Sequence, residues 1–177
     1  ACVGAVTNVV PRPVLQADVG TSWQMQSIHL RPPEVADRLI PGHWEADMIK
    51  GAMNRSSVGT LVERTTLMVV LAQMPDGTAQ SALDGFSEAL SAIPPELRKT
   101  FTYDQGREMS KHAQLTARTG VAVYFCDPHS PWQRGLNENT NGLLRQYLPK
   151  GADLSVYRQE QLDVIAWSLN TRPRKSL

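Results

Sequence analysis

Three acidic residues in separate stretches of the chain could do chemistry together. They are Asp47 in GHWEADMIKG, Asp104 in FTYDQG and Glu138 in SPWQRGLNENTNGLLRQYLPKG. Carboxylates that a fold brings together repel one another unless a cation lies between them. A pair of divalent metal ions is the usual cation, and paired metal ions perform phosphoryl transfer on nucleic acids. The three acids therefore predict a metal-dependent site for that chemistry.

The segment around Glu138 gives the clearest geometric signal of a site. Its polar residues follow a spacing of 4, 3 and 4: Arg134, Glu138, Asn141 and Arg145. In an α-helix these positions fall within roughly 60° of one another. A second set with the same spacing is expected to pack on the opposite side: Leu136, Thr140, Leu143 and Tyr147. The polar face is either a solvated outer surface or part of a site. The proline-rich approach CDPHSPWQRG and the indole of Trp132, which is costly to expose in a loop without a packing or binding role, favour a site.

The two aspartates also have ordinary structural interpretations. Asp47 could be a strand-edge or turn residue, although strand interiors are depleted in Asp. Asp104 begins Asp-Gln-Gly, which is a common turn sequence. Three rival acids are present: Asp84 is expected on an exposed helix face, Asp127 precedes a proline and suits a turn or cap, and Glu45 lies close to Asp47.

Other catalytic and metal-binding patterns are weaker. Cys126-x-x-His129 resembles half of a zinc site, but the sequence has no matching second pair. The sequence contains no GxxxxGK phosphate loop and no GxSxG nucleophile elbow, which argues against a nucleoside triphosphatase and an α/β-hydrolase. His43 and His129 lie near proposed metal ligands, where a packing or surface role is favoured over a contact in the site.

The elements that must position the acids follow from hydrophobic periodicity. Five stretches are strand-like: HWEADMIKG, SSVGTLVERTT, LMVVLAQMP, FTYDQG and VAVYFCD, the last apolar enough to be expected buried on both faces. Four stretches are helix-like: TAQSALDGFSEALSAI, MSKHAQLTARTG with Gly120 as its stop, the Glu138 segment, and QEQLDVIAWSLNTR. Their order predicts an α/β fold with a mixed sheet, antiparallel at first and parallel later, and helices on both faces.

Composition is that of a soluble globular domain. The chain has 177 residues, of which 41% are hydrophobic and 20% charged, and no apolar run is long enough to span a membrane. Two cysteines, Cys2 and Cys126, favour a reducing cytoplasm over a disulfide framework. Residues 1–129 hold 11 Lys/Arg against 13 Asp/Glu, and residues 130–177 hold 7 against 4. This split, −2 followed by +3, suits an acidic metal site beside a phosphate-contacting surface.

Several of these stretches resemble one known family. GHWEADMIKG, TYDQGREM, VYFCDPHSPWQRGLNENTNGLLRQYLPKGADLSV and LNTRPRKSL look like the catalytic core of bacterial insertion-sequence transposases of the DDE type, in the insertion-sequence-thirty family. The resemblance covers residues 27–177 and implies a ribonuclease-H-like fold, the integrase catalytic core, with a five-stranded sheet flanked by helices. In that fold the first and fourth strands are adjacent, which implies that Asp47 lies beside Asp104, with Glu138 reaching in from a helix.

The resemblance also implies a reaction, a cofactor and partners. Asp47, Asp104 and Glu138 match a catalytic triad that binds two Mg²⁺ or Mn²⁺ ions for cleavage and strand transfer of DNA. The partners would be insertion-sequence ends and target DNA, and the active form a homo-oligomer in the bacterial cytoplasm, associated with the nucleoid. Candidate DNA contacts are Arg134, Asn141, Arg145, Lys150, Arg172, Arg174 and Lys175.

The sequence departs from the family at its two ends. Residues 1–26 do not match the family's N-terminal helix-turn-helix region and are expected to be irregular. The chain stops at Leu177, where relatives continue, so we expect a truncated copy. Two alternatives to a transposase stay open from these observations. One is a catalytically silent remnant that binds DNA nonspecifically or dimerises, and the other is a nuclease that lacks the joining step.

Overall fold

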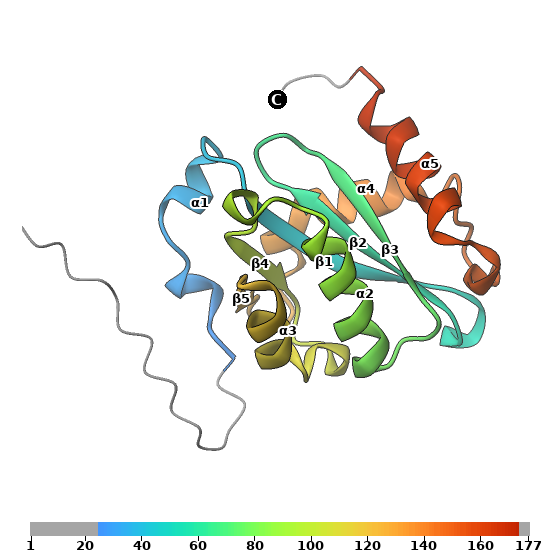
Figure 1. The fold of residues 1–177 in the computed structure, drawn as a ribbon, viewed down its shortest axis with the longest axis horizontal. Helices are drawn as coiled ribbons and strands as arrows, with labels where there is room; N and C mark the ends of the chain where they lie inside the picture. The colour runs from blue at the N-terminus through green and yellow to red at the C-terminus, as the bar shows by residue number, and fades with distance from the viewer. Residues whose placement is uncertain (1–24, 174–177) are drawn as a thin grey trace, which may run out of the picture.

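A five-stranded mixed sheet in the order β3-β2-β1-β4-β5 forms the centre of the protein (Figure 1). The structure is a computed structural model that describes residues 25–173. β1 pairs antiparallel with β2 and parallel with β4; β2 pairs antiparallel with β3, and β4 pairs parallel with β5. This arrangement confirms the predicted mixed sheet. The strands are β1 (His43–Lys50), β2 (Ser57–Glu63), β3 (Val69–Met74), β4 (Thr100–Tyr103) and β5 (Ala122–Phe125).

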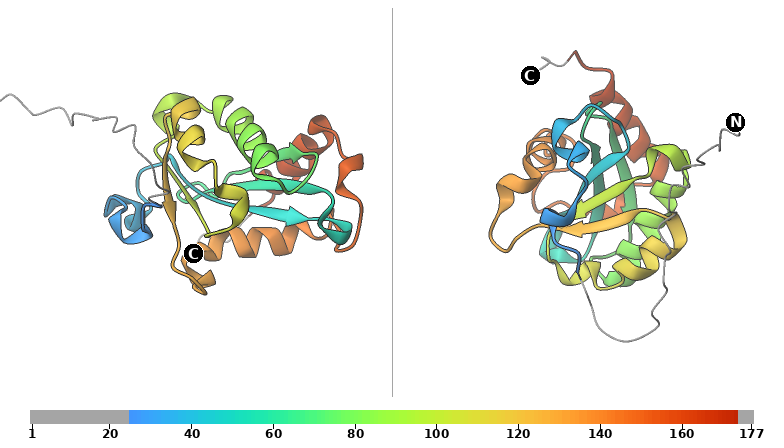
Figure 2. Two further views of the ribbon diagram at one scale, coloured as in Figure 1. Left: turned by 90° about the horizontal axis from the view of Figure 1, so that it is seen from below. Right: turned by 90° about the vertical axis from the view of Figure 1, so that its left-hand side faces the viewer.

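Helices cover both faces of the sheet (Figure 2). α2 and α3 lie on one face, and α4 crosses the opposite face, where α5 packs along β3. No helix within residues 25–173 is long and apolar enough to cross a membrane. The four longer helices were predicted, and α1 is a single short turn. The helices are α1 (Glu34–Asp37), α2 (Ala79–Ser91), α3 (His112–Thr119), α4 (Gly135–Leu144) and α5 (Gln159–Asn170).

Strand alternation divides the interior into two cores and decides which side chains meet α4. In β1, Trp44 and Met48 enter the core beneath α2 and α3, whereas Ile49 enters the core shared with α4 and α5. Because successive side chains of a strand point to opposite faces, Asp47 lies on the same face as Ile49. By the same rule Asp104, which follows the inward-facing Tyr103 of β4, lies on the α4 face.

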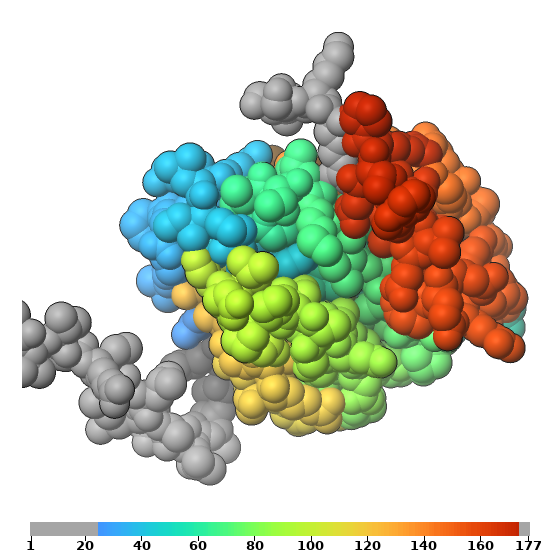
Figure 3. Space-filling model, turned by 45° about the horizontal axis from the view of Figure 1, so that its top comes forward, coloured from blue at the N-terminus to red at the C-terminus, as the bar shows by residue number. Residues whose placement is uncertain are grey.

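Residues 27–41, which we call the lead-in segment, run beside the strand ends. Ser27 forms a parallel bridge with Phe125 of β5, which attaches the start of the segment to the sheet. At its other end the Thr65 hydroxyl donates a hydrogen bond of 3.1 Å to the carbonyl of Ile40. Figure 3 shows this part of the chain against the turn between β2 and β3. The lead-in segment therefore forms one wall at the edge of the α4 face.

Two packing predictions were wrong. β5 is an edge strand, so its burial alternates instead of being complete on both faces: Val123 and Phe125 are buried, and Tyr124 is half-buried. On α4, the prediction fails at Leu143, which is 37% exposed, whereas Leu144 packs on the sheet; of the other predicted positions, Thr140 is buried and Leu136 and Tyr147 are partly buried against the core. The helix is rotated from the predicted orientation because its buried face is set by polar groups as well as apolar ones.

Candidate active site

Asp47 and Asp104 lie at neighbouring positions of two adjacent parallel strands. The β1–β4 register pairs Glu45 with Thr102, and two residues further along the same register lie Asp47 and Asp104. Asp104 is the first residue after β4, where its carboxylate accepts a hydrogen bond of 3.0 Å from the backbone N–H of Gly106. The side chain of Asp47 is 24% exposed and that of Asp104 is 43% exposed. The structure therefore brings these two predicted site residues together at an accessible edge.

Arg134 lies between the two aspartates. Its Nη1 is 3.3 Å from Asp47 Oδ1, and its Nη2 is 3.1 Å from Asp104 Oδ2. Nη1 also donates to the carbonyl of Ala46 at 3.2 Å, and the guanidinium lies over the ring of Tyr103. Only 7% of Arg134 is exposed, so it is buried between the sheet and the start of α4. The cation that relieves the repulsion between the carboxylates in this structure is thus a side chain.

Burial dominates the electrostatics of Asp47. Desolvation raises the pKa of the Asp47 carboxyl above its usual 3.8, and the neighbouring charge of Asp104 adds to the rise. The guanidinium of Arg134 and the hydrogen bond from the backbone of Met48 act in the opposite direction without cancelling it. A buried carboxylate that costs free energy to ionise is typical of a functional site, because a simple surface aspartate carries no such cost.

Glu138 occupies the helix face that contacts Asp47, although it does not touch the aspartates. Asn141 donates a hydrogen bond of 3.0 Å from Nδ2 to Asp47 Oδ2. Glu138 lies four residues after Arg134 and three before Asn141, so it is on the same side of the helix as both. Its side chain is exposed and forms no hydrogen bond or ion pair within residues 25–173. In that range no three His, Cys, Asp or Glu side chains are close enough to hold a metal ion.

A buried polar cluster docks the start of α4 onto the sheet. Glu45, which is 1% exposed, forms an ion pair with Arg64 and accepts a hydrogen bond of 3.1 Å from the backbone N–H of Asn137. The side chain of Asn137 donates to the carbonyl of Glu45 at 2.9 Å and accepts from the hydroxyl of Thr60 at 3.0 Å. We call these four residues the docking cluster. They were not predicted as site residues. Glu45 could have indicated the cluster, because it is a second acid two positions before Asp47 and therefore lies on the same strand face.

The remaining predicted DNA contacts lie away from the aspartates. Arg145 donates to the carbonyl of Leu148 at 3.3 Å at the far end of α4, and Lys150 is exposed beyond it. Arg172 stacks over the ring of Tyr147, with 5.6 Å between the guanidinium carbon and the ring centre. Arg174 and Lys175 lie outside the described residues. Of the predicted DNA contacts, the structure therefore places Arg134 and Asn141 at the aspartates. The other described ones lie along the far part of α4 and after α5.

The rival acids and the half zinc site have structural roles. Asp84 pairs with Arg118 on the exposed surface of α2 and α3. The carboxylate of Asp127 pairs with His29 at 2.7 Å and accepts from Gln133 at 2.8 Å. Cys126 is buried with a free thiol. No metal-binding group of three ligands forms around it within the described part of the chain.

The residues present around Asp47 fit a divalent cation. Carboxylate oxygens are the ligands that Mg²⁺ prefers, and Asp47 and Asp104 offer them from neighbouring strands. Beside them the Oδ1 atom of Asn141 is buried and has no hydrogen-bond partner among the described residues. Such an oxygen is unusual in a folded protein and would be satisfied by a hydrated ion. Binding of an ion between the aspartates requires that the guanidinium of Arg134 move aside.

Comparison with known proteins identifies the class of domain that this geometry forms. The sequence profile of the Integrase core domain family matches residues 39–131, slightly more than half of the chain. A cryo-electron-microscopy structure of the simian T-cell lymphotropic virus intasome contains a chain with the same fold, with a TM-score of 0.57 at 18% identity. The alignment covers 89% of this chain and 63% of that one. The protein therefore belongs to the integrase core domain family.

Two similar relatives are transposases of insertion sequences. The transposase for insertion sequence element IS1086 from Cupriavidus metallidurans is 70% identical over 153 residues, which are 86% of this chain and 45% of the relative. Transposase InsI for insertion sequence element IS30A from Escherichia coli is 45% identical over 150 residues, 85% of this chain and 39% of the relative. The chain is similar to one part of these insertion-sequence transposases, and it spans less than half the length of either relative.

Replacing Arg134 tests its role as the cation between the aspartates. We expect Arg134→Met to lower the free energy of unfolding by about 1–3 kcal/mol without divalent metal, because two facing carboxylates lose their shared hydrogen-bond donor. Millimolar Mn²⁺ should restore more stability to this variant than it adds to the parent. Urea denaturation with and without Mn²⁺ measures both effects. Arg118→Met is the matched control, since it breaks an exposed pair worth less than about 1 kcal/mol. Equal stability and an equal Mn²⁺ response in Arg134→Met and the parent would contradict this role.

The raised pKa of Asp47 predicts a pH dependence of stability. Because the folded protein holds the Asp47 proton more tightly than the unfolded chain, this group's contribution to the free energy of unfolding falls as the pH rises from 3.8 through the raised pKa. Asp47→Asn should remove that fall. The free energy of unfolding of the variant should therefore rise relative to that of the parent through this pH window, and the difference between the two should stay constant above it. Urea denaturation at a series of pH values, without divalent metal, provides the measurement. Parallel pH profiles for the two proteins would show that burial does not govern the ionisation of Asp47.

The docking cluster predicts a large difference between two neighbouring asparagines of α4. Asn137 is fully buried and Asn139 is exposed. Asn137→Ala should lower the free energy of unfolding by about 2–4 kcal/mol, because it leaves buried groups of Glu45 and Thr60 without partners. Asn139→Ala should change it by less than about 0.5 kcal/mol. Chemical denaturation of both variants is the measurement, and similar values for the two would mean that the cluster does not hold α4 in place.

Proposed function

We propose that this chain is the catalytic core of a transposase that cleaves DNA at the ends of an insertion sequence and joins those ends to target DNA. The observation that carries the proposal is the pairing of Asp47 with Asp104 on adjacent strands, beneath the helix face that presents Glu138. Two relatives that cover most of this chain are transposases of insertion sequences. The relatives support transposition over a nuclease that lacks the joining step.

The three acids would act together as ligands for divalent metal ions, Mg²⁺ or Mn²⁺, two in the full site. Such ions would polarise the phosphodiester and activate the attacking oxygen, which belongs to water in cleavage and to a DNA 3′-hydroxyl in joining. Asp47 and Asp104 supply oxygen ligands from the rigid centre of the sheet. Glu138 is exposed on α4, where a change of side-chain rotamer can bring it toward the aspartates. Asn141 orients Asp47 through the hydrogen bond to its Oδ2.

Arg134 has two states in this proposal. Without metal its guanidinium pairs with both aspartates. With an ion held by the aspartates, the guanidinium of Arg134 would be released from them and would be available to contact the reacting phosphate. Arg145, Lys150 and Arg172 would contact the DNA backbone further along, which adds affinity without sequence choice. We place the protein in the bacterial cytoplasm, bound to DNA, and propose that it works as a homo-oligomer.

A strand-transfer assay tests the proposed reaction. Labelled DNA that carries the terminal sequences of an IS1086-type element is incubated with the chain and Mg²⁺ or Mn²⁺, and joined products are separated by size. A second, branched substrate presents an element end already joined to target DNA and tests the reverse reaction, which depends less on recognition of the ends. We expect metal-dependent product from the branched substrate. Asp104→Asn and Glu138→Gln should each reduce its rate by about a hundredfold or more, because each removes charge from the metal site.

Matched variants separate a loss of chemistry from a loss of folding. Asp84→Asn and Glu160→Gln change exposed acids of the same types on α2 and α5 and should retain the parental rate. Thermal unfolding of each variant checks that it is folded. If the chain gives no metal-dependent product from either substrate, the catalytic role is wrong for this chain. DNA binding without product would instead point to the silent remnant.

A further inference from the structure

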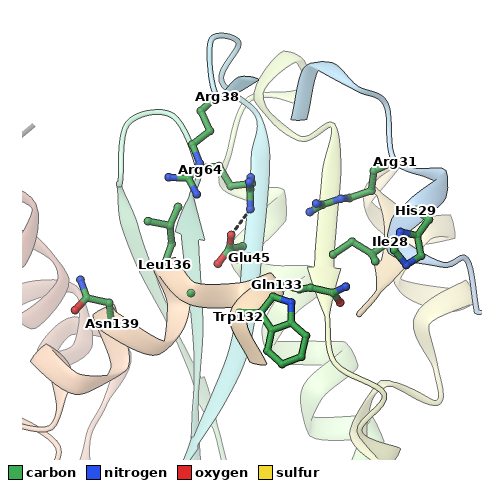
Figure 4. Close-up of a pocket in the computed structure, with 11 residues that line it drawn as sticks. Ile28, His29, Arg31, Arg38, Glu45, Arg64, Trp132, Gln133, Leu136 and Asn139 are labelled. Carbon is green, nitrogen blue, oxygen red and sulfur yellow. Dashed lines mark hydrogen bonds and ion pairs between the residues drawn. The ribbon is translucent and has the colours of Figure 1, made fainter. Parts of the chain in front are cut away.

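A cavity lies on the α4 face of the sheet, next to the aspartates. It has a volume of about 550 Å³, within the roughly 300–1,000 Å³ of ligand sites. The lead-in segment, β1 and the start of α4 form its walls, and Glu45 lies at its base (Figure 4). Glu45 is two residues before Asp47 on the same strand face, so the cavity begins roughly 7 Å from that carboxylate. This distance is similar to the spacing of neighbouring phosphates along a DNA strand.

Positive charge in this cavity exceeds negative charge. Three arginines line it, and the ion pair with Glu45 neutralises Arg64. Arg31 and Arg38 form no ion pair within residues 25–173, and the Nε atom of Arg31 is buried there without a hydrogen-bond partner. Figure 4 shows Arg31 extending into the cavity from the lead-in segment, with Arg38 on the other side. Burial and the nearby Arg64 lower the pKa of Arg31, as expected for crowded cations that an anion would relieve.

The rim of the cavity carries an aromatic surface. Trp132 lies in the 3-10 helix Pro131–Arg134 that leads into α4, and 73% of it is exposed. Arg31 donates a hydrogen bond of 3.1 Å to the hydroxyl of Thr102 but forms no ion pair in the described part of the chain. An exposed indole beside such arginines offers a stacking surface and phosphate donors together. Proteins that bind single strands use this combination, because every base has a flat face and every nucleotide a phosphate.

We propose that this cavity binds one unpaired nucleotide of the DNA strand that adjoins the reacting phosphate. Arg31 and Arg38 contact its phosphate, and Trp132 stacks on its base. The inference rests on the proposed function for its ligand, and it adds a specific nucleotide site outside the three acids. A base inside a duplex does not expose its face, so the site should favour single-stranded over double-stranded DNA.

Binding of a short DNA in the absence of metal tests the cavity separately from catalysis. The probe is a fluorescein-labelled single-stranded oligothymidylate of eight nucleotides, followed by fluorescence anisotropy in EDTA. We expect Trp132→Ala to weaken binding roughly five- to hundredfold, as for loss of one stacked base, and Trp132→Phe to retain most of the affinity. Trp167→Ala is the matched control, because Trp167 is 67% exposed on α5 and should contribute nothing.

The salt dependence separates the roles of the indole and the arginines. Arg38→Gln should reduce the slope of log K against log salt concentration by about 0.7, the value for one phosphate contact to a single strand. Trp132→Ala should leave that slope unchanged, and so should Arg118→Gln on the opposite face. A blunt duplex should bind more weakly than the single strand, because its bases are not free to stack on Trp132.

Several results would overturn the assignment. Parental affinity in Trp132→Ala, an equal loss in Trp167→Ala, or an unchanged salt slope in Arg38→Gln would each do so. Equal affinity for the blunt duplex and the single strand would show that no unpaired base enters the cavity. These outcomes are independent of the strand-transfer assay. If strand transfer fails but the expected binding pattern is observed, the nucleotide site is supported and the catalytic proposal is wrong. If strand transfer occurs but the binding pattern is not observed, only the nucleotide site is rejected.

Discussion

The attachment of α4 to the central strand is the constraint on which the rest of the site depends. Glu45 is almost completely buried, and a buried carboxylate is tolerated only when its charge and its hydrogen bonds are satisfied. Arg64 supplies the charge, and the backbone of Asn137 supplies a donor. Because the side chain of Asn137 also bonds to Glu45 of β1 and to Thr60 of β2, the helix cannot rotate or slide without leaving several buried polar groups without partners.

That fixed rotation determines what the helix presents to the aspartates. Arg134, Glu138 and Asn141 share one face, and the two that are buried or half-buried already contact Asp47. The neighbouring helix α4 therefore holds Asp47 in its buried position. Asp47 cannot lower the free-energy cost of its desolvation by a local movement. The proposed divalent ion would find these groups already in position. The stability lost at Asp47 is offset by the two cores on either side of the sheet.

The same strand face joins the aspartate pair and the arginine-lined cavity. Glu45 separates them, and its pairing with Arg64 leaves the charge of Arg31 and Arg38 available at one end and the carboxylates at the other. A strand of DNA lying along this face would meet cations and an indole first and the metal site next. In the proposed site, affinity and chemistry would therefore depend on separate contacts along one surface, which can be altered independently.

The sequence by itself determined the sheet and the four longer helices, because periodicity is a local property of the chain, and its family motifs predicted the three acids as a site. Alternation along β1 and β4 also fixed the face on which Asp47 and Asp104 lie, once the strands were adjacent. Only the tertiary structure showed that Arg134 is the cation between them, that Glu45 holds α4, and that Leu143 is exposed. Those features depend on distances between residues far apart in the chain. Spacing along a helix gives the residues that share a face, but the partners across the interface decide which face is buried.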